Sequence, residues 1–138
     1  VLGGGLAEAR RGVALVEGRN VLVQDELQAP DREVTVRWAM ATPAEVTLKG
    51  ERTAMLRRKG EICRLRVLEP QDARLEVLDI SEPENDYDAP NEGVSMVVFH
   101  HTLEAGGKTR FAVLLEPVVE GEEPGEVEVV SLGEWGER

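Results

Sequence analysis

A carboxylate on an otherwise apolar strand face is the first residue of this sequence that suggests chemistry. Residues 19–27 read Arg-Asn-Val-Leu-Val-Gln-Asp-Glu-Leu, and their aliphatic and β-branched side chains predict a β-strand. Side chains alternate between the two faces of a strand, so Asp25 shares its face with three aliphatic residues: Val21, Val23 and Leu27. An unpaired buried charge is costly, so Asp25 is either half of a structural ion pair or a site residue. We expect a structural pair, and the candidate partners are Arg10, Arg11 and Arg37.

Two adjacent histidines, His100 and His101, are the natural candidates for metal ligands. On a strand they point to opposite faces, so this geometry does not let both bind one metal ion. Zinc sites usually draw three or four ligands from His, Cys and carboxylates, and no spacing brings Cys63 or an acid to either histidine. We interpret both histidines as half-buried strand residues. Cys63 shares a strand face with Leu65 and Val67, and we interpret it as a small apolar core residue.

The irregular segment 81–93 is the densest cluster of acids, with two prolines that mark it as a loop. The spacing Asp86-x-Asp88 faintly resembles a calcium loop, but the expected glycine and terminal glutamate are missing. We expect a solvated acidic loop, and calcium binding is the alternative.

Aromatic residues make up only 4% of the chain, so each one is a possible platform for a sugar ring. Trp38 shares its predicted strand face with Val34, Val36 and Met40, which favours core packing. Sugar stacking is the alternative, and it makes Trp38 the one weak candidate for substrate binding. No nucleophile elbow, phosphate loop or distinct carboxylate pair is present. The sequence therefore predicts no catalytic residue, no metal site and no cofactor.

Short strands dominate the pattern that must position these side chains. Segments with a period of two or with β-branched runs alternate with turns rich in Gly, Pro, Asp and Asn. The expected strands cover residues 14–16, 21–27, 34–40, 45–48, 53–57, 62–68, 75–80, 94–103, 109–115 and 126–132. The only helix candidates, residues 6–11 and 41–45, are too short to stand alone. About nine or ten short strands predict an all-β sandwich or barrel.

Length and charge restrict the class of protein further. A chain of 138 residues suits one domain with its own core. We expect a flexible lead-in over residues 1–9, a β-sandwich domain over 10–132 and a frayed tail over 133–138. The net charge of −11 argues against nucleic acid and anionic membranes as partners, and against this domain alone gripping a polyanionic sugar. No signal peptide or membrane-spanning run is visible, and the start at Val1 without methionine suggests a piece of a longer protein.

Six segments in a fixed order carry a resemblance to a known family. They read RRGVAL (10–15), NVLVQDEL (20–27), VRWAMAT (36–42), AML (54–56), LRVLEP (65–70) and FAVLLEP (111–117). In these strand patterns the chain resembles the C-terminal β-region of heparinase II/III-like polysaccharide lyases. The resemblance spans roughly residues 10 to 117, and it favours an antiparallel β-sandwich.

The resemblance implies a role within a larger enzyme. Lyases of this family pair a helical toroid with β-sandwich layers and cleave uronic-acid-containing polysaccharides by β-elimination, with tyrosine and histidine as acid and base. Tyr87, His100 and His101 match no catalytic motif of the family, so no catalytic role is carried over. We therefore expect a non-catalytic, bacterial, periplasmic or secreted module whose partner is an upstream catalytic domain, with polysaccharide as a possible second partner. The alternative is a stand-alone carbohydrate-binding module, with Trp38 or Trp135 as its stacking platform.

Overall fold

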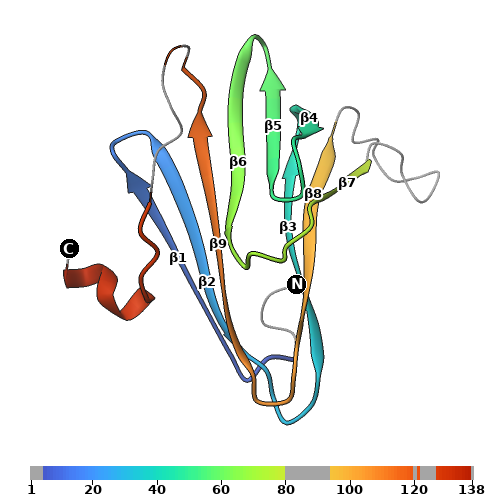
Figure 1. The fold of residues 1–138 in the computed structure, drawn as a ribbon, viewed down its shortest axis with the longest axis vertical. Coiled ribbons are helices and arrows are strands. Elements are labelled where there is room, and N and C mark those ends of the chain that lie inside the picture. Colours follow the sequence, from blue (N-terminus) through green and yellow to red (C-terminus); the bar gives the residue numbers. More distant parts are fainter. Residues whose placement is uncertain (1–4, 80–93, 120, 122–126, 138) are drawn as a thin grey trace, which may run out of the picture.

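The computed structural model describes residues 5–79, 94–119, 121 and 127–137, and this part of the chain is built almost entirely from antiparallel strands (Figure 1). The strands are β1 (Glu8–Val16), β2 (Asn20–Gln28), β3 (Val34–Thr42), β4 (Glu45–Leu48), β5 (Thr53–Arg58), β6 (Glu61–Glu69), β7 (Glu76–Asp79), β8 (Ser95–Leu103) and β9 (Lys108–Pro117). A 3-10 helix, η1 (Leu132–Glu137), follows near the C-terminus. The expected antiparallel β-sandwich is confirmed.

The strands form a six-stranded sheet in the order β1-β2-β9-β6-β5-β4 and a three-stranded sheet in the order β3-β8-β7. The chain crosses between the sheets after β2, β3, β6 and β8, and the first and last of these crossings are joined by backbone hydrogen bonds. These two crossings lie together, because Ala29 N–H donates to the Gly107 carbonyl at 2.8 Å and Gly106 N–H donates to the Pro30 carbonyl at 2.7 Å. From this end β1, β2 and β9 diverge from β3 and β8 (Figure 1).

The core between the sheets is aliphatic except for three aromatic rings that contact one another in a row. Trp38 lies parallel to Phe99 with ring centroids 5.6 Å apart, and Phe99 meets Phe111 edge-on at 5.1 Å. Leu65 and Val67 pack in the same cluster. These rings link β3 and β8 of the small sheet to β9 of the large sheet, so they join the two layers.

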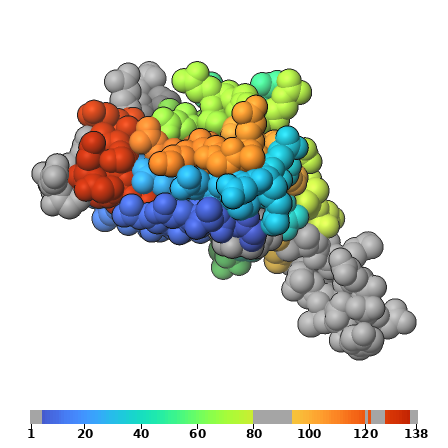
Figure 2. Space-filling view, turned by 90° about the horizontal axis from the view of Figure 1, so that it is seen from below, coloured from blue at the N-terminus to red at the C-terminus, as the bar shows by residue number. Residues whose placement is uncertain are grey.

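The outer face of the large sheet carries a second apolar cluster, which the C-terminal segment covers. Val127, Val129 and Trp135 pack on Leu22 and Leu114. Two polar contacts hold the segment down: Gln24 Nε2 donates to the Val130 carbonyl at 2.6 Å, and Leu132 N–H donates to Glu26 Oε2 at 2.9 Å. Figure 2 shows this segment in red against the strands of the sheet.

Three expected boundaries differ from the structure. β1 begins at Glu8 instead of residue 14, inside the expected lead-in, because residues 8–16 pair along the whole of β2. Residues 127–131 form no strand, since they cross the face of the sheet and do not extend its edge. The expected frayed tail includes η1, and Trp135 anchors it to the sheet. The acidic segment 81–93, with its calcium alternative, lies outside the described residues.

Candidate functional site

Asp25 is half of an ion pair with Arg11, so the structural interpretation of this carboxylate is confirmed. Arg11 Nε donates to Oδ1 at 2.6 Å and Nη2 donates to Oδ2 at 3.1 Å. The two residues face each other across β1 and β2. The hydrogen bonds to Asp25 raise the pKa of the Arg11 guanidinium. Of the three candidate partners, the register selects Arg11, because it lies directly opposite Asp25.

Trp38, the weak candidate for sugar binding, is a core residue. It is 4% exposed and its ring is stacked on Phe99. A sugar would have to displace the facing sheet to reach the indole. The sugar-stacking alternative for Trp38 is therefore wrong in this fold, because the strand turns that face inward.

The two histidines point to opposite faces of β8, as the alternation predicts. His100 is exposed and lies opposite Arg37 on β3. His101 is half-buried, with its ring edge-on to Phe111 and its Nδ1 3.8 Å from an Asp72 carboxylate oxygen. Within the described ranges, no three His, Cys, Asp or Glu side chains are placed to hold a metal ion.

Positive charge is concentrated in one stretch of this acidic chain. Residues 49–74 contain eight of the sixteen Lys and Arg residues and four of the 27 acids, so the stretch carries +4 and the rest of the chain carries −15. A single net charge for the whole chain hides this polarity. The surface formed by β5, β6 and the turns that flank them is therefore suited to an anionic partner.

The strand alternation brings several of these cations to one face of the large sheet. Leu65 and Val67 point into the core, so Arg64 and Arg66 of the same strand point outward. Arg57 of β5 also points outward, because Leu56 is buried on the other side. This outer face lies beside the apolar cluster that the C-terminal segment covers.

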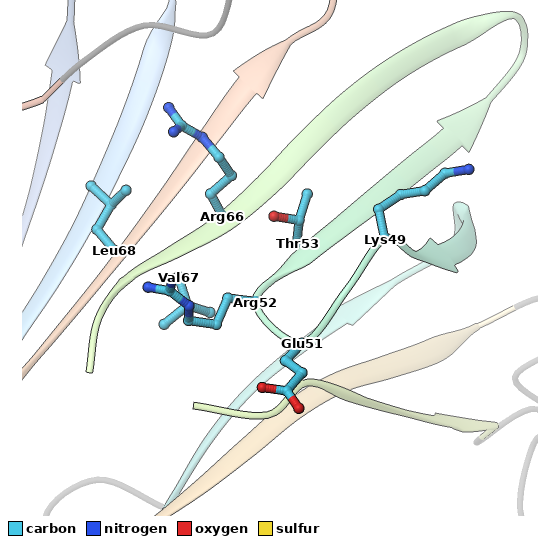
Figure 3. A pocket seen from close by; sticks show the side chains of 7 residues that line it. All are labelled: Lys49, Glu51, Arg52, Thr53, Arg66, Val67 and Leu68. Atoms are coloured by element: carbon cyan, nitrogen blue, oxygen red, sulfur yellow. The ribbon is translucent and has the colours of Figure 1, made fainter. Parts of the chain in front are cut away.

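The basic face carries two pockets. One pocket of about 510 Å³ is lined by residues from the β4–β5 turn, β5 and β6: Lys49, Glu51, Arg52, Thr53, Arg66, Val67 and Leu68 (Figure 3). A second pocket of about 260 Å³ is lined by Glu45, Thr47, Lys49, Met55 and Arg57. Lys49 lines both pockets, so we treat them as one feature and call it the basic groove.

The floor and rim of the basic groove differ in how their charges are paired. Arg66 Nε donates to Glu116 Oε1 at 2.7 Å, and Arg64 Nη1 lies 3.9 Å from the same oxygen. Glu116 is only 3% exposed, so it neutralises part of the charge from below. Among the residues that the structure describes, no carboxylate pairs with Lys49, Arg52 or Arg57.

A second surface feature is apolar. Val13 and Leu15 of β1 are 62% and 66% exposed, and they lie opposite Val23 and Val21 of β2. All four point to the inner face of the large sheet, on the side of Asp25. We call these four residues the β1–β2 apolar strip. The strip is exposed because the small sheet, which is only three strands wide, diverges from β1 and does not cover it (Figure 1).

Sequence reasoning did not identify the basic groove, although the uneven spread of Lys and Arg over residues 49–74 is a signal that could have found it. No family model matches the chain, and no curated protein matches it. Nor does any helix in the described ranges have the length and apolar character needed to cross a membrane.

Proposed function

We propose that this chain is a non-catalytic β-sandwich module of a heparinase II/III-like polysaccharide lyase, in which it packs against the catalytic domain of the same parent protein. The six segments that carry the resemblance overlap strands β1, β2, β3, β5, β6 and β9, and this supports the proposal because the resemblance consists of strand patterns. By the same resemblance we propose a bacterial parent that works in the periplasm or outside the cell.

The β1–β2 apolar strip is the observation that supports packing of this module against the catalytic domain. A monomeric domain rarely leaves several large aliphatic side chains together on an open sheet face, and such patches mark sites of association. Val13 and Leu15 are the two most exposed large apolar side chains in the described ranges. The catalytic domain of the parent is the occupant that we propose for the strip.

The alternative, a stand-alone carbohydrate-binding module that stacks sugars on tryptophan, has lost its main support. Trp38 is buried, and Trp135 packs in the cluster beneath the C-terminal segment. The Trp38 indole offers no open platform. Trp135 is half-buried and lines a pocket of about 530 Å³ with Leu22 and Val127, but its ring is packed in the outer apolar cluster, and we therefore favour the supporting module.

The test compares the parent protein with residues 1–138 alone on an acidic polysaccharide, following the ultraviolet absorbance of the unsaturated uronate that β-elimination creates. We expect the parent to release unsaturated uronate and the 138-residue chain to release none. Activity of the short chain would contradict its non-catalytic role. An inactive parent would contradict the lyase assignment.

Substitution of the strip tests the packing role. In the parent, Leu15→Asp should separate the unfolding of the module from that of the catalytic domain, because a carboxylate cannot be buried there without a partner. Val119→Asp is the matched control, since Val119 is 42% exposed and lies after β9, outside the strip. Equal effects of the two substitutions would argue against the strip as the docking surface.

A further inference from the structure

We propose that the basic groove binds the anionic groups of a linear acidic polysaccharide. This inference rests on the proposed function in one respect: it gives the supporting module a direct contact with the substrate class of its parent. The groove itself is defined by the lining residues and charges of this chain alone.

The first argument is the unpaired charge. In a chain of net charge −11, acids outnumber cations by 27 to 16, so surface cations have many possible partners. Yet Lys49, Arg52 and Arg57 pair with no carboxylate in the described part of the chain. Glu51, which precedes Arg52, lies 3.6 Å from Arg74 instead, and Glu45, which faces Arg57 across β4 and β5, forms no ion pair with it in the described part of the chain. Three free cations along one groove favour an anionic ligand.

The second argument is the rigidity of the floor. The buried Glu116 carboxylate holds Arg66 at 2.7 Å, and the register places Arg66 opposite Thr53 of the neighbouring strand. The turn that carries Arg52 is also fixed, because Val67 N–H donates to the Arg52 carbonyl at 2.9 Å. The charged side chains of the groove therefore project from a sheet and from a turn that is held by a backbone hydrogen bond. This lowers the conformational entropy lost on binding.

The third argument is the direction of the side chains. In Figure 3 the amino group of Lys49 points away from the guanidinium groups of Arg52 and Arg66, so the three do not meet at one point. Arg57 extends the series, because Lys49 lines the second pocket with it. Charges spread along a groove suit a polymer whose anionic groups repeat, and they suit a single small anion poorly.

A polysaccharide fits this surface better than a nucleic acid does. Single-stranded nucleic acids are gripped by aromatic rings on which the bases stack, and the residues lining the groove include no aromatic ring. The planar guanidinium groups of arginine can donate two parallel hydrogen bonds, which suits the carboxylates and sulfates of an acidic sugar chain.

The experiment uses residues 1–138 and measures binding by affinity electrophoresis in gels that contain one polymer each. Polygalacturonate offers carboxylates, dextran sulfate offers sulfates, dextran offers no charge, and single-stranded DNA offers phosphates with bases. The test variant is Arg52→Gln/Arg57→Gln. The matched control is Arg10→Gln/Arg32→Gln, which removes the same charge from two exposed arginines outside the groove.

We expect retardation by polygalacturonate or dextran sulfate, and the stronger of the two identifies the anionic group. The test variant should bind that polymer about tenfold more weakly, with a shallower dependence on salt. The control should bind as tightly as the unsubstituted chain. Equal weakening of both variants, binding to DNA as strong as to either polysaccharide, or no binding to any charged polymer would each overturn the proposal. Uronate release by the parent lyase is measured separately. The groove proposal and the lyase proposal can therefore each fail without the other.

Discussion

Arg11 and Asp25 form a bidentate ion pair in which the arginine is partly exposed to solvent and the aspartate is buried. The Arg11 side chain is 46% exposed, and the Asp25 side chain is 1% exposed. The pair joins the edge strand β1 to β2 at the point where the inner face of the sheet passes from the core to the open apolar strip. The burial difference decides what each half of the pair does for stability.

Removing Arg11 should destabilise the protein more than removing Asp25. Arg11→Met leaves a buried carboxylate without its partner, and we expect a loss on the order of 3 kcal/mol in the free energy of unfolding. Asp25→Asn leaves a guanidinium that can reach water, so we expect about 1–2 kcal/mol. Urea unfolding followed by circular dichroism measures both values.

Arg10→Met is the matched control for this pair. Arg10 precedes Arg11 on β1, points to the other face and is exposed, so its replacement should change the free energy of unfolding by less than about 0.5 kcal/mol. A larger loss for Asp25→Asn than for Arg11→Met would contradict the proposed asymmetry.

Gly12 should be intolerant of a side chain, because the C-terminal segment presses on the strand there. A Cβ at Gly12 would lie 2.6 Å from both Leu132 Cδ2 and Trp135 Cζ3. We expect Gly12→Ala to cost about 1–3 kcal/mol by overpacking. The cost should shrink in a Trp135→Ala background, which a double-mutant cycle measures. A Gly12→Ala variant as stable as the parent would show that the segment is not anchored at this position.

Trp38 should behave as a core residue in solution. The chain has two tryptophans, so a Trp135→Phe background isolates the fluorescence of Trp38. Its emission should be that of a buried indole and should not shift when oligosaccharide is added. Trp38→Ala should cost about 3–5 kcal/mol. A ligand-dependent emission shift would revive the sugar-stacking interpretation.

Cys63 should react slowly with thiol reagents. Burial raises the pKa of the Cys63 thiol, which lowers the fraction of reactive thiolate near neutral pH. Alkylation by iodoacetamide at about pH 8 should be on the order of tenfold slower than that of a free cysteine. The rate should rise to the free value in denaturant, and mass spectrometry follows both reactions. An equally fast reaction of the folded protein would contradict the half-buried position of Cys63.

The alternation of side chains along each strand could be predicted from the sequence, and so could the features that depend on it. This alternation places Cys63 with Leu65, separates His100 from His101 and puts Asp25 on an apolar face. The all-β class followed from short strands between turn residues. These features are local, because a strand sets its two faces within a few residues.

Only the tertiary structure decided which elements meet. The pairing of β1 with β2 chose Arg11 for Asp25, and the placement of β9 beside β6 brought Glu116 under Arg66. No strand forms over residues 127–131 of the expected strand 126–132, and residues 132–137 form η1, because the outer face of the sheet offers the C-terminal segment an apolar surface and two polar partners, Gln24 and Glu26. The lateral order of strands is set by packing between residues far apart in the chain, and no local pattern records it.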